Sequence, residues 1–219
     1  MLLLLTALAL GAMHSFAPDH LAAVSVFVSR RPSWRRAMSL GARWGLGHSL
    51  TVLIVGGTLA LSGLRMPERF ATNAERAVGV VLIVIGVAAL ARSARLHVHT
   101  HAHDDGTKHW HLHGHASAPT HDHGHGALLG IGMLHGLAGT GALVVALPAV
   151  VAASRGQALL YLICFGAGTI LSMAMFGAAA GHALRAASRS SARVLRFATL
   201  LAGASSVGVG AWWLAVGGA

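Results

Sequence analysis

Met13-His14-Ser15-Phe16-Ala17-Pro18-Asp19-His20 places two imidazoles, a carboxylate and a proline inside an apolar run. Apolar residues lie on both sides of this stretch, from Leu2 to Leu10 and from Leu21 to Val28. A charged group within a bilayer costs on the order of 2.5–3.5 kcal/mol even on the mildest insertion scale. The stretch therefore predicts both a membrane helix and a functional site within it.

The composition of the whole chain is that of a membrane protein. Of its 219 residues, 55% are hydrophobic and only 10% are charged, whereas soluble domains carry about 25% charged residues. The net charge of +10 comes from short basic clusters between apolar runs, a pattern that records membrane orientation. We therefore do not expect nucleic acid as a partner. The single cysteine, Cys164, excludes both a disulfide framework and a thiolate metal site within the chain.

Apolar segments of about 20 residues cross a bilayer as helices. By this criterion we predict an all-α membrane protein with six transmembrane helices, at 2–28, 37–63, 74–92, 127–153, 157–184 and 194–216. We interpret the first segment as a membrane helix rather than a signal peptide, because no basic residue precedes it and the apolar character resumes after His20. This first helix is expected to be interrupted at Pro18.

Basic residues are unevenly distributed among the connectors. The first, third and fifth connectors carry eleven Lys and Arg residues, and the second and fourth carry four. The positive-inside rule then places the odd-numbered connectors in the cytoplasm and both termini outside. We expect a multi-pass protein of a bacterial-type plasma (inner) membrane.

The two halves of the chain match at a constant offset of 121 residues. At this offset His14 aligns with His135, and four glycines align with glycines: Gly11, Gly45, Gly47 and Gly56 with Gly132, Gly166, Gly168 and Gly177. Three helices per half would make the halves inverted repeats, an arrangement found in transporters. Close helix packing at glycines is the alternative explanation. We predict a first three-helix repeat at 1–92, a His-rich cytoplasmic loop at 93–126, and a second three-helix repeat at 127–219.

Five polar residues in the predicted helices are candidate metal ligands: His14, Asp19, His20, His48 and His135. Pro18 cannot donate a hydrogen bond to the carbonyl of His14. In a regular helix the first three candidates would point in different directions, so a distortion at Pro18 is needed for them to converge. Imidazoles with one carboxylate suit nickel, cobalt, copper and zinc. The alternative is a structural polar cluster that neighbouring helices satisfy.

The third connector is rich in histidine. Eleven histidines lie in it: His97, His99, His101, His103, His109, His111, His113, His115, His121, His123 and His125. This composition cannot form a packed core and predicts a disordered metal-binding segment, with a solvated low-complexity linker as the alternative. Imidazoles that are mostly neutral at cytoplasmic pH can bind metal. We expect the loop to raise the metal concentration at the cytoplasmic mouth of the protein.

Two motifs of enzymes are missing from the sequence. It holds no His-Glu-x-x-His motif of a zinc peptidase and no Gly-x-x-x-x-Gly-Lys loop of an ATPase. We therefore expect no enzymatic activity and no resident cofactor.

The motif His14-x4-Asp19-His20, followed by 21–24, resembles the signature of permeases in the nickel/cobalt transporter superfamily. Gly47-His48-Ser49 and the segment 135–139 are similar to further parts of that superfamily. The resemblance implies that His14, Asp19 and His20 bind the transported ion, Ni²⁺ or Co²⁺, and that His48 and His135 contribute. Urease-associated nickel permeases belong to the same superfamily.

Two departures from the permease pattern bear on the direction of transport. Permeases with this signature often have eight spans, whereas six are expected here. The long His-rich loop resembles the nickel/cobalt exporters of the superfamily, although those exporters usually carry Gly where Asp19 stands.

The sequence thus predicts alternating-access transport of a divalent transition-metal cation, with uptake favoured over efflux. The expected partners are the metal ion as substrate and the lipid bilayer. The sequence is also compatible with a homo-oligomer of this chain. Two alternatives stay open, namely an exporter of zinc or another heavy metal, and a membrane metalloenzyme or metal sensor.

Overall fold

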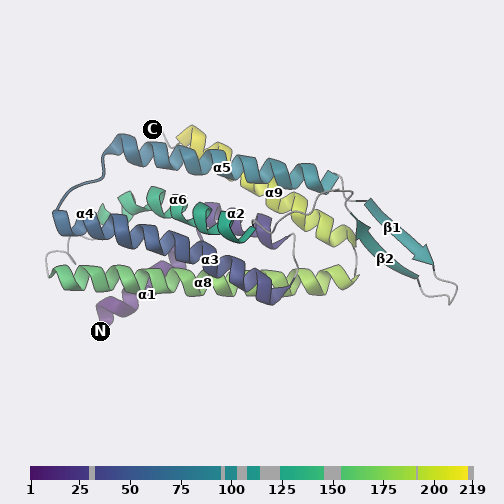
Figure 1. The fold of residues 1–219 in the computed structure, drawn as a ribbon, viewed down its shortest axis with the longest axis horizontal. Coiled ribbons are helices and arrows are strands. Elements are labelled where there is room, and N and C mark those ends of the chain that lie inside the picture. Colours follow the sequence, from purple (N-terminus) through teal and green to yellow (C-terminus); the bar gives the residue numbers. More distant parts are fainter. Residues whose placement is uncertain are drawn as a thin grey trace.

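The computed structural model describes residues 1–29, 33–94, 97–102, 108–113, 124–145, 154–190 and 192–216. Their helices are α1 (Leu2–His14), α2 (Pro18–Val28), α3 (Trp34–Thr51), α4 (Gly57–Ser62), α5 (Glu68–Ala94), α6 (Gly124–Val145), α8 (Arg155–Ser190) and α9 (Ala192–Val216), as shown in Figure 1. A π-helical segment, η1 (Val52–Gly56), joins α3 to α4 without a break in the helix axis visible in Figure 1.

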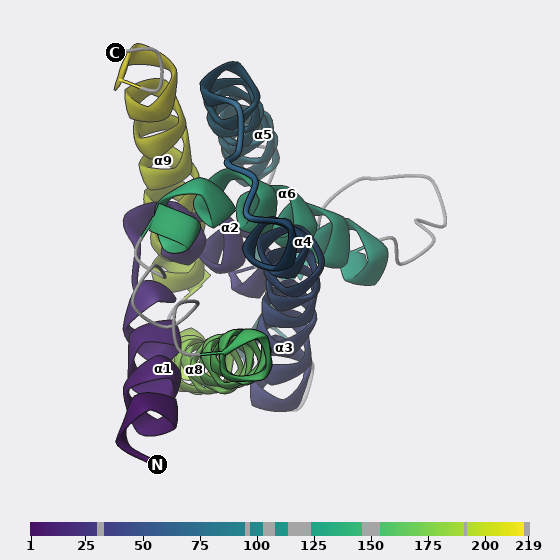
Figure 2. The ribbon, with the colours of Figure 1, turned by 90° about the vertical axis from the view of Figure 1, so that its left-hand side faces the viewer.

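The helices form an elongated bundle of three rows. Figure 2 shows α1, α8 and α3 in one row, α2 and α6 in the middle, and α9 and α5 in the third. The most extensive helix pairs are α3 with α8, α5 with α9, and α3 with α6. The first two pairs lie within the outer rows, and the pair of α3 with α6 joins one outer row to the middle row.

The first expected helix is broken where the sequence predicts a break. α1 ends at His14, α2 begins at Pro18, and the two helices are bent by 61°. Pro18 occupies the first position of α2, where its missing N–H costs nothing and its fixed φ suits the start of a helix. The predicted interruption is therefore confirmed, and it takes the form of a new helix rather than a mid-helix kink.

Four described helical segments are long and apolar enough to cross a membrane: Trp34–Ser62, Glu68–Ala94, Arg155–Ala187 and Arg193–Val216. The bent pair α1 and α2 forms a fifth candidate if it is one span. The fourth expected span, 127–153, coincides with α6 as far as Val145, and 146–153 lies outside the described residues. The chain is a multi-pass membrane protein with an all-helical membrane part.

Glycines set the closest helix crossings. A Cβ added to Gly45 on α3 would lie 2.8 Å from the Cα of Ile170 on α8. On the other outer pair, a Cβ added to Gly86 of α5 would lie 2.7 Å from the carbonyl oxygen of Gly203 on α9. Both distances are too short for a side chain, so these helices approach through small residues, as membrane helices commonly do.

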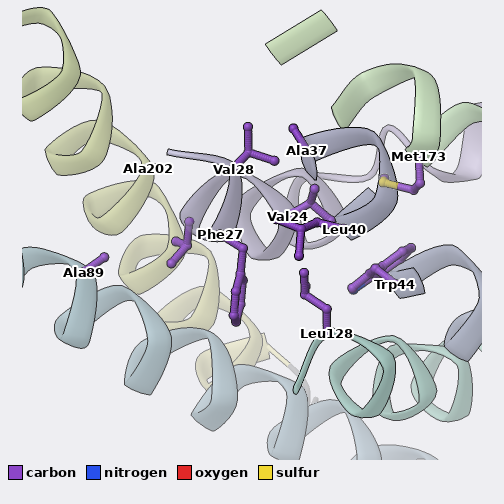
Figure 3. Packing of buried hydrophobic residues seen from close by; sticks show 11 residues of the cluster. Val24, Phe27, Val28, Ala37, Leu40, Trp44, Ala89, Leu128, Met173 and Ala202 are labelled. Carbon is purple, nitrogen blue, oxygen red and sulfur yellow. The ribbon is translucent and has the colours of Figure 1, made fainter. Parts of the chain in front are cut away.

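Two apolar clusters matter for the site. The Trp44 cluster, shown in Figure 3, consists of Val24, Val26, Phe27, Val28, Ala37, Leu40, Trp44, Ala89, Leu128, Met173 and Ala202. The Phe165 cluster consists of Val52, Leu162 and Phe165. All of these side chains are buried.

The connector 93–126, for which the sequence predicts disorder, contains two described strands, β1 (His97–Ala102) and β2 (Lys108–His113). They pair antiparallel, and the register places His97 opposite His113, His99 opposite His111, and His101 opposite His109. The physical reason lies in the alternation of histidine with residues such as Val98 and Trp110, since a period of two with β-branched and aromatic residues suits strands. The remaining expected loop histidines lie outside the described residues, except His125, which falls in the first turn of α6.

Candidate metal centre

The break between α1 and α2 positions three of the five candidate ligands. His14 is the last residue of α1, and Asp19 and His20 lie in the first turn of α2. The positive end of the α2 dipole favours the carboxylate at this place. Asp19 and His20 are both buried, which their polar side chains tolerate only with suitable partners.

The other two candidates come from neighbouring helices. His48 lies on α3 and His135 on α6, and both side chains are almost completely buried. The structure thus brings all five predicted ligands into one region at the junction of α1, α2, α3 and α6.

His14, His20 and His48 form a three-imidazole group. One ring nitrogen from each residue lies within 4.8 Å of the others. The ring centroids are 4.7 Å apart for His14 and His20, and 5.2 Å apart for each of the other two pairs. Imidazole nitrogens bind a metal ion such as zinc at about 2.0–2.1 Å. Small side-chain movements would therefore close the group around one ion.

Asp19 connects this group to the fourth imidazole. Its Oδ2 atom lies 3.4 Å from Nε2 of His20 and 3.9 Å from Nε2 of His135. The rings of His20 and His135 have centroids 5.5 Å apart. The carboxylate thus lies beside two imidazoles that come from different helices.

Backbone carbonyls orient two of the rings. Nδ1 of His20 lies 3.1 Å from the carbonyl oxygen of His14, and Nδ1 of His135 lies 2.9 Å from that of Ile131. A carbonyl oxygen only accepts hydrogen bonds, so Nδ1 is the donor in both rings. In the neutral rings Nε2 then carries a lone pair, which is the arrangement of imidazoles that bind metals.

This orientation makes two hydrogen-bond acceptors face each other. In the neutral ring the lone pair on Nε2 of His20 lies 3.4 Å from the carboxylate oxygen of Asp19. Two acceptors repel each other unless a proton or a metal ion lies between them. A proton or a metal ion between the two atoms would remove this repulsion.

Several buried nitrogens at this place have no hydrogen-bond partner among the described residues. They are Nε2 of His14, both ring nitrogens of His48, Nε2 of His135 and Nε1 of Trp44. Buried polar atoms in proteins normally have a partner. The four imidazole nitrogens among these atoms are therefore available as metal ligands.

Two aromatic residues that the sequence pattern does not single out lie next to the imidazoles. Trp44 stacks on His48 with ring centroids 5.2 Å apart and an interplanar angle of 19°, and its centroid lies 4.7 Å from that of His20. Phe165 lies 5.5 Å from His14. Trp44 precedes His48 by one helical turn, and this spacing is the sequence signal that could have pointed to it.

Gly139 on α6 borders the same group. A Cβ built at this position would lie 3.7 Å from Nε2 of His14 and 3.9 Å from Cε1 of His48. These are ordinary van der Waals distances. A residue with a small side chain would therefore fit at position 139, beside the imidazoles.

Comparisons with known proteins agree with a membrane protein. Residues 22–205 match the family described as the cytochrome c biogenesis protein transmembrane region. The chain is 32% identical to the urease accessory protein UreH of Bacillus sp. (strain TB-90) over 167 residues, 76% of this chain and 71% of that protein.

Two plant proteins are also similar. The chain is 27% identical to the chloroplast protein FOR GROWTH AND FERTILITY 1 of Arabidopsis thaliana over 203 residues, 91% of this chain and 55% of that protein. It is 27% identical to FOR GROWTH AND FERTILITY 2 over 202 residues, 52% of that protein. The chain thus spans about half the length of these two relatives. No solved structure matches it.

Proposed function

The chain belongs to the cytochrome c biogenesis protein transmembrane region family, and on this premise we propose that it carries a divalent first-row transition-metal ion, Ni²⁺ or Co²⁺, across a membrane. The observation that carries the proposal is the pair of facing acceptors, Nε2 of His20 and Oδ2 of Asp19, 3.4 Å apart and buried. They lie beside two further imidazoles, those of His14 and His48. This set of donor atoms supports the binding of a cation.

The donor atoms and one relative favour nickel or cobalt. Imidazoles with one carboxylate suit borderline metals, whereas copper(I) prefers thiolate and thioether ligands. The Bacillus relative is named a urease accessory protein, and urease-associated nickel permeases belong to the superfamily that the His14-x4-Asp19-His20 motif resembles. The metal is the transported substrate, and the protein is a transporter rather than an enzyme.

The helix break gathers ligands for the transported ion in one place. The ion exchanges its water for His14, His20 and His48, while Asp19 offsets its charge and His135 approaches from α6. Irregular backbone is tolerated at membrane depth where it lines such a site. Because imidazoles bind metal only when deprotonated, binding releases any protons that these side chains hold.

We also propose that the chain crosses the membrane six times, as two inverted three-helix repeats. At the offset of 121 residues, contact pairs correspond across the halves. A Cβ at Gly11 would overlap the carbonyl of Phe165, and one at Gly132 would overlap that of Trp44. A second matching set is Gly47 against Leu129 and Met133, with Gly168 against Leu8 and Ala12. These reciprocal contacts support two halves of opposite orientation.

The orientation follows from the distribution of basic residues. Both termini lie outside, and the connector that contains β1 and β2 lies in the cytoplasm of a bacterial-type cell, at its plasma membrane. There the histidines of the connector raise the metal concentration at the cytoplasmic mouth of the site, a feature of the exporters. We favour uptake over efflux because the His14-x4-Asp19-His20 motif resembles that of the permeases.

The test is the metal content of cells with and without the protein, measured by mass spectrometry for nickel, cobalt, zinc and copper. The wild-type chain is expected to raise nickel or cobalt, and His20→Ala to abolish the increase. His182→Ala is the matched control, because His182 is an exposed imidazole on α8 outside the metal centre. An unchanged metal content with the wild-type chain would contradict the proposal.

The alternatives give different results in the same measurement. An exporter of zinc or another heavy metal lowers the content of that metal in cells. A membrane metalloenzyme or metal sensor leaves the content unchanged, and the purified protein carries stoichiometric metal that does not exchange.

A further inference from the structure

We propose that Trp44 and Phe165 are two gates that close the metal centre from opposite ends of the bundle. Trp44 closes it toward the end at which α3 begins, and Phe165 closes it toward the other end. This inference rests on the proposed function, because a gate has a role only where an ion passes through the centre.

Each aromatic ring covers a different part of the imidazole group. Trp44 lies against His20 and His48, with centroid distances of 4.7 Å and 5.2 Å. Phe165 lies 5.5 Å from His14. Trp44 is completely buried and Phe165 is 4% exposed, so both rings are packed inside the bundle.

The register of α3 against α8 places the rings at different heights. Gly45 lies against Ile170, and Gly166 lies against Ser49, so the helices run antiparallel. Phe165 is therefore level with the residue after Ser49. With a rise of about 1.5 Å per residue, Trp44 and Phe165 lie about 9 Å apart along the bundle. His48 lies between these two heights.

Each ring belongs to an apolar cluster that continues away from the site. The Trp44 cluster extends to Ala37 and Val28, near the beginning of α3 and the end of α2. Among the described residues, the Phe165 cluster adds Val52 and Leu162 to Phe165, and Leu53 and Tyr161 pack against it. A hydrated ion cannot cross either cluster unless the ring moves.

The two rings correspond to each other in the proposed inverted repeat. The offset of 121 residues relates Trp44 to Phe165, and it also relates Val52 of the Phe165 cluster to Met173 of the Trp44 cluster. Alternating access needs one closure on each side of the site, and inverted halves provide them as equivalent parts. The equivalence therefore explains why both sides of the centre have an aromatic residue.

Trp44 has an unmet hydrogen bond that favours movement. Its Nε1–H is buried with no partner among the described residues. Buried indole N–H groups usually find an acceptor. When the ring tilts toward water this donor gains a partner, which offsets part of the loss of apolar contact. Phe165 has no such donor.

The test measures access to the centre from each side of the membrane. Gly139→Cys, in a chain that also carries Cys164→Ser, places one thiol beside His14 and His48. A membrane-impermeant thiol reagent is added to right-side-out and to inside-out vesicles without metal. We expect slow labelling of this chain from both sides, because both gates are closed.

Removing one ring should open one side only. Trp44→Ala is expected to speed labelling about tenfold, equivalent to about 1.4 kcal/mol, from the side at which α3 begins. Phe165→Ala is expected to do the same from the opposite side. Leu82→Ala is the matched control, because Leu82 is fully buried in the bundle but belongs to neither cluster. Where Trp44→Ala does not insert in the membrane, Trp44→Leu replaces it.

Faster labelling of both variants from the same side, or of neither, would overturn the gates. Labelling of the Leu82→Ala chain as fast as that of the gate variants would overturn them as well. Labelling is measured without metal, so a result against the gates can be distinguished from a result against the proposed function. The latter appears as an unchanged metal content in cells.

Discussion

Nδ1 of His20 lies 3.1 Å from the carbonyl oxygen of His14, across the break between α2 and α1. In an unbroken helix this carbonyl would accept the backbone N–H of residue 18, which proline lacks. The break leaves the carbonyl with Ala17 N–H and the imidazole of His20. The same break that interrupts the helix therefore orients a candidate ligand.

Pro18→Ala is expected to weaken metal binding although it removes no ligand. Proline within a helix costs about 3 kcal/mol, so its removal favours a continuous helix in which Asp19 and His20 turn away from His14. We expect the dissociation constant for Ni²⁺, measured by calorimetry on the purified protein, to rise about tenfold or more. Pro67→Ala, in the exposed segment between α4 and α5, is the control. Normal Ni²⁺ affinity of Pro18→Ala would contradict a role for the break.

Asp19→Asn is expected to stabilise the metal-free protein while weakening metal binding. The amide of asparagine can donate a hydrogen bond to Nε2 of His20, so the two facing acceptors no longer repel each other. A buried hydrogen bond of this kind contributes about 0.5–1.5 kcal/mol. The melting temperature in detergent without metal should rise, and the Ni²⁺ affinity should fall. A lower melting temperature of Asp19→Asn without metal would show that the carboxylate is already satisfied.

The five polar residues of the candidate metal centre could be singled out from the sequence, because a carboxylate and imidazoles in apolar segments are rare and costly. The structure brings them together, and their role as metal ligands stays a prediction. The break at Pro18 could be predicted for a similar reason, since proline has one strong effect on a helix. Phe165 could not be predicted, and Trp44 had only its spacing of one helical turn before His48 to point to it. Aromatic residues are ordinary in membrane helices, and the packing of α3, α8 and the broken helix brings Trp44 to His20 and Phe165 to His14.

The crossing of α5 with α9 could also not be predicted by aligning the two halves of the sequence at one constant offset. Gly79 lies against Gly210, and Gly86 against Gly203. Gly79 and Gly203 are 124 residues apart, as are Gly86 and Gly210, so the offset of 121 does not align them. Helix contacts depend on the surfaces that meet, and a connector of different length changes the offset without changing the contact.

Gly45→Ala is expected to destabilise the protein through the crossing of α3 and α8. The new Cβ would lie 2.8 Å from the Cα of Ile170, so the backbone of one helix must shift. Overpacking of this kind costs about 1–3 kcal/mol. The melting temperature in detergent should fall clearly below that of the wild-type chain. Gly208→Ala should leave it nearly unchanged, because a Cβ there meets nothing within 4 Å. Equal stability of the two variants would contradict the close approach at Gly45.

Gly139→Leu is expected to block the metal centre by volume alone. A Cβ at this position fits 3.7 Å from Nε2 of His14, so Gly139→Ala should bind Ni²⁺ nearly as well as the wild-type chain. The further carbons of leucine would extend between His14 and His48, where an ion shared by these imidazoles must lie. Gly130→Leu, on the same helix with nothing within 4 Å of its Cβ, separates this effect from a general effect of leucine in α6. Calorimetry with Ni²⁺ should therefore show binding for Gly139→Ala and Gly130→Leu and none for Gly139→Leu. Undiminished binding by Gly139→Leu would place the ion away from the three-imidazole group.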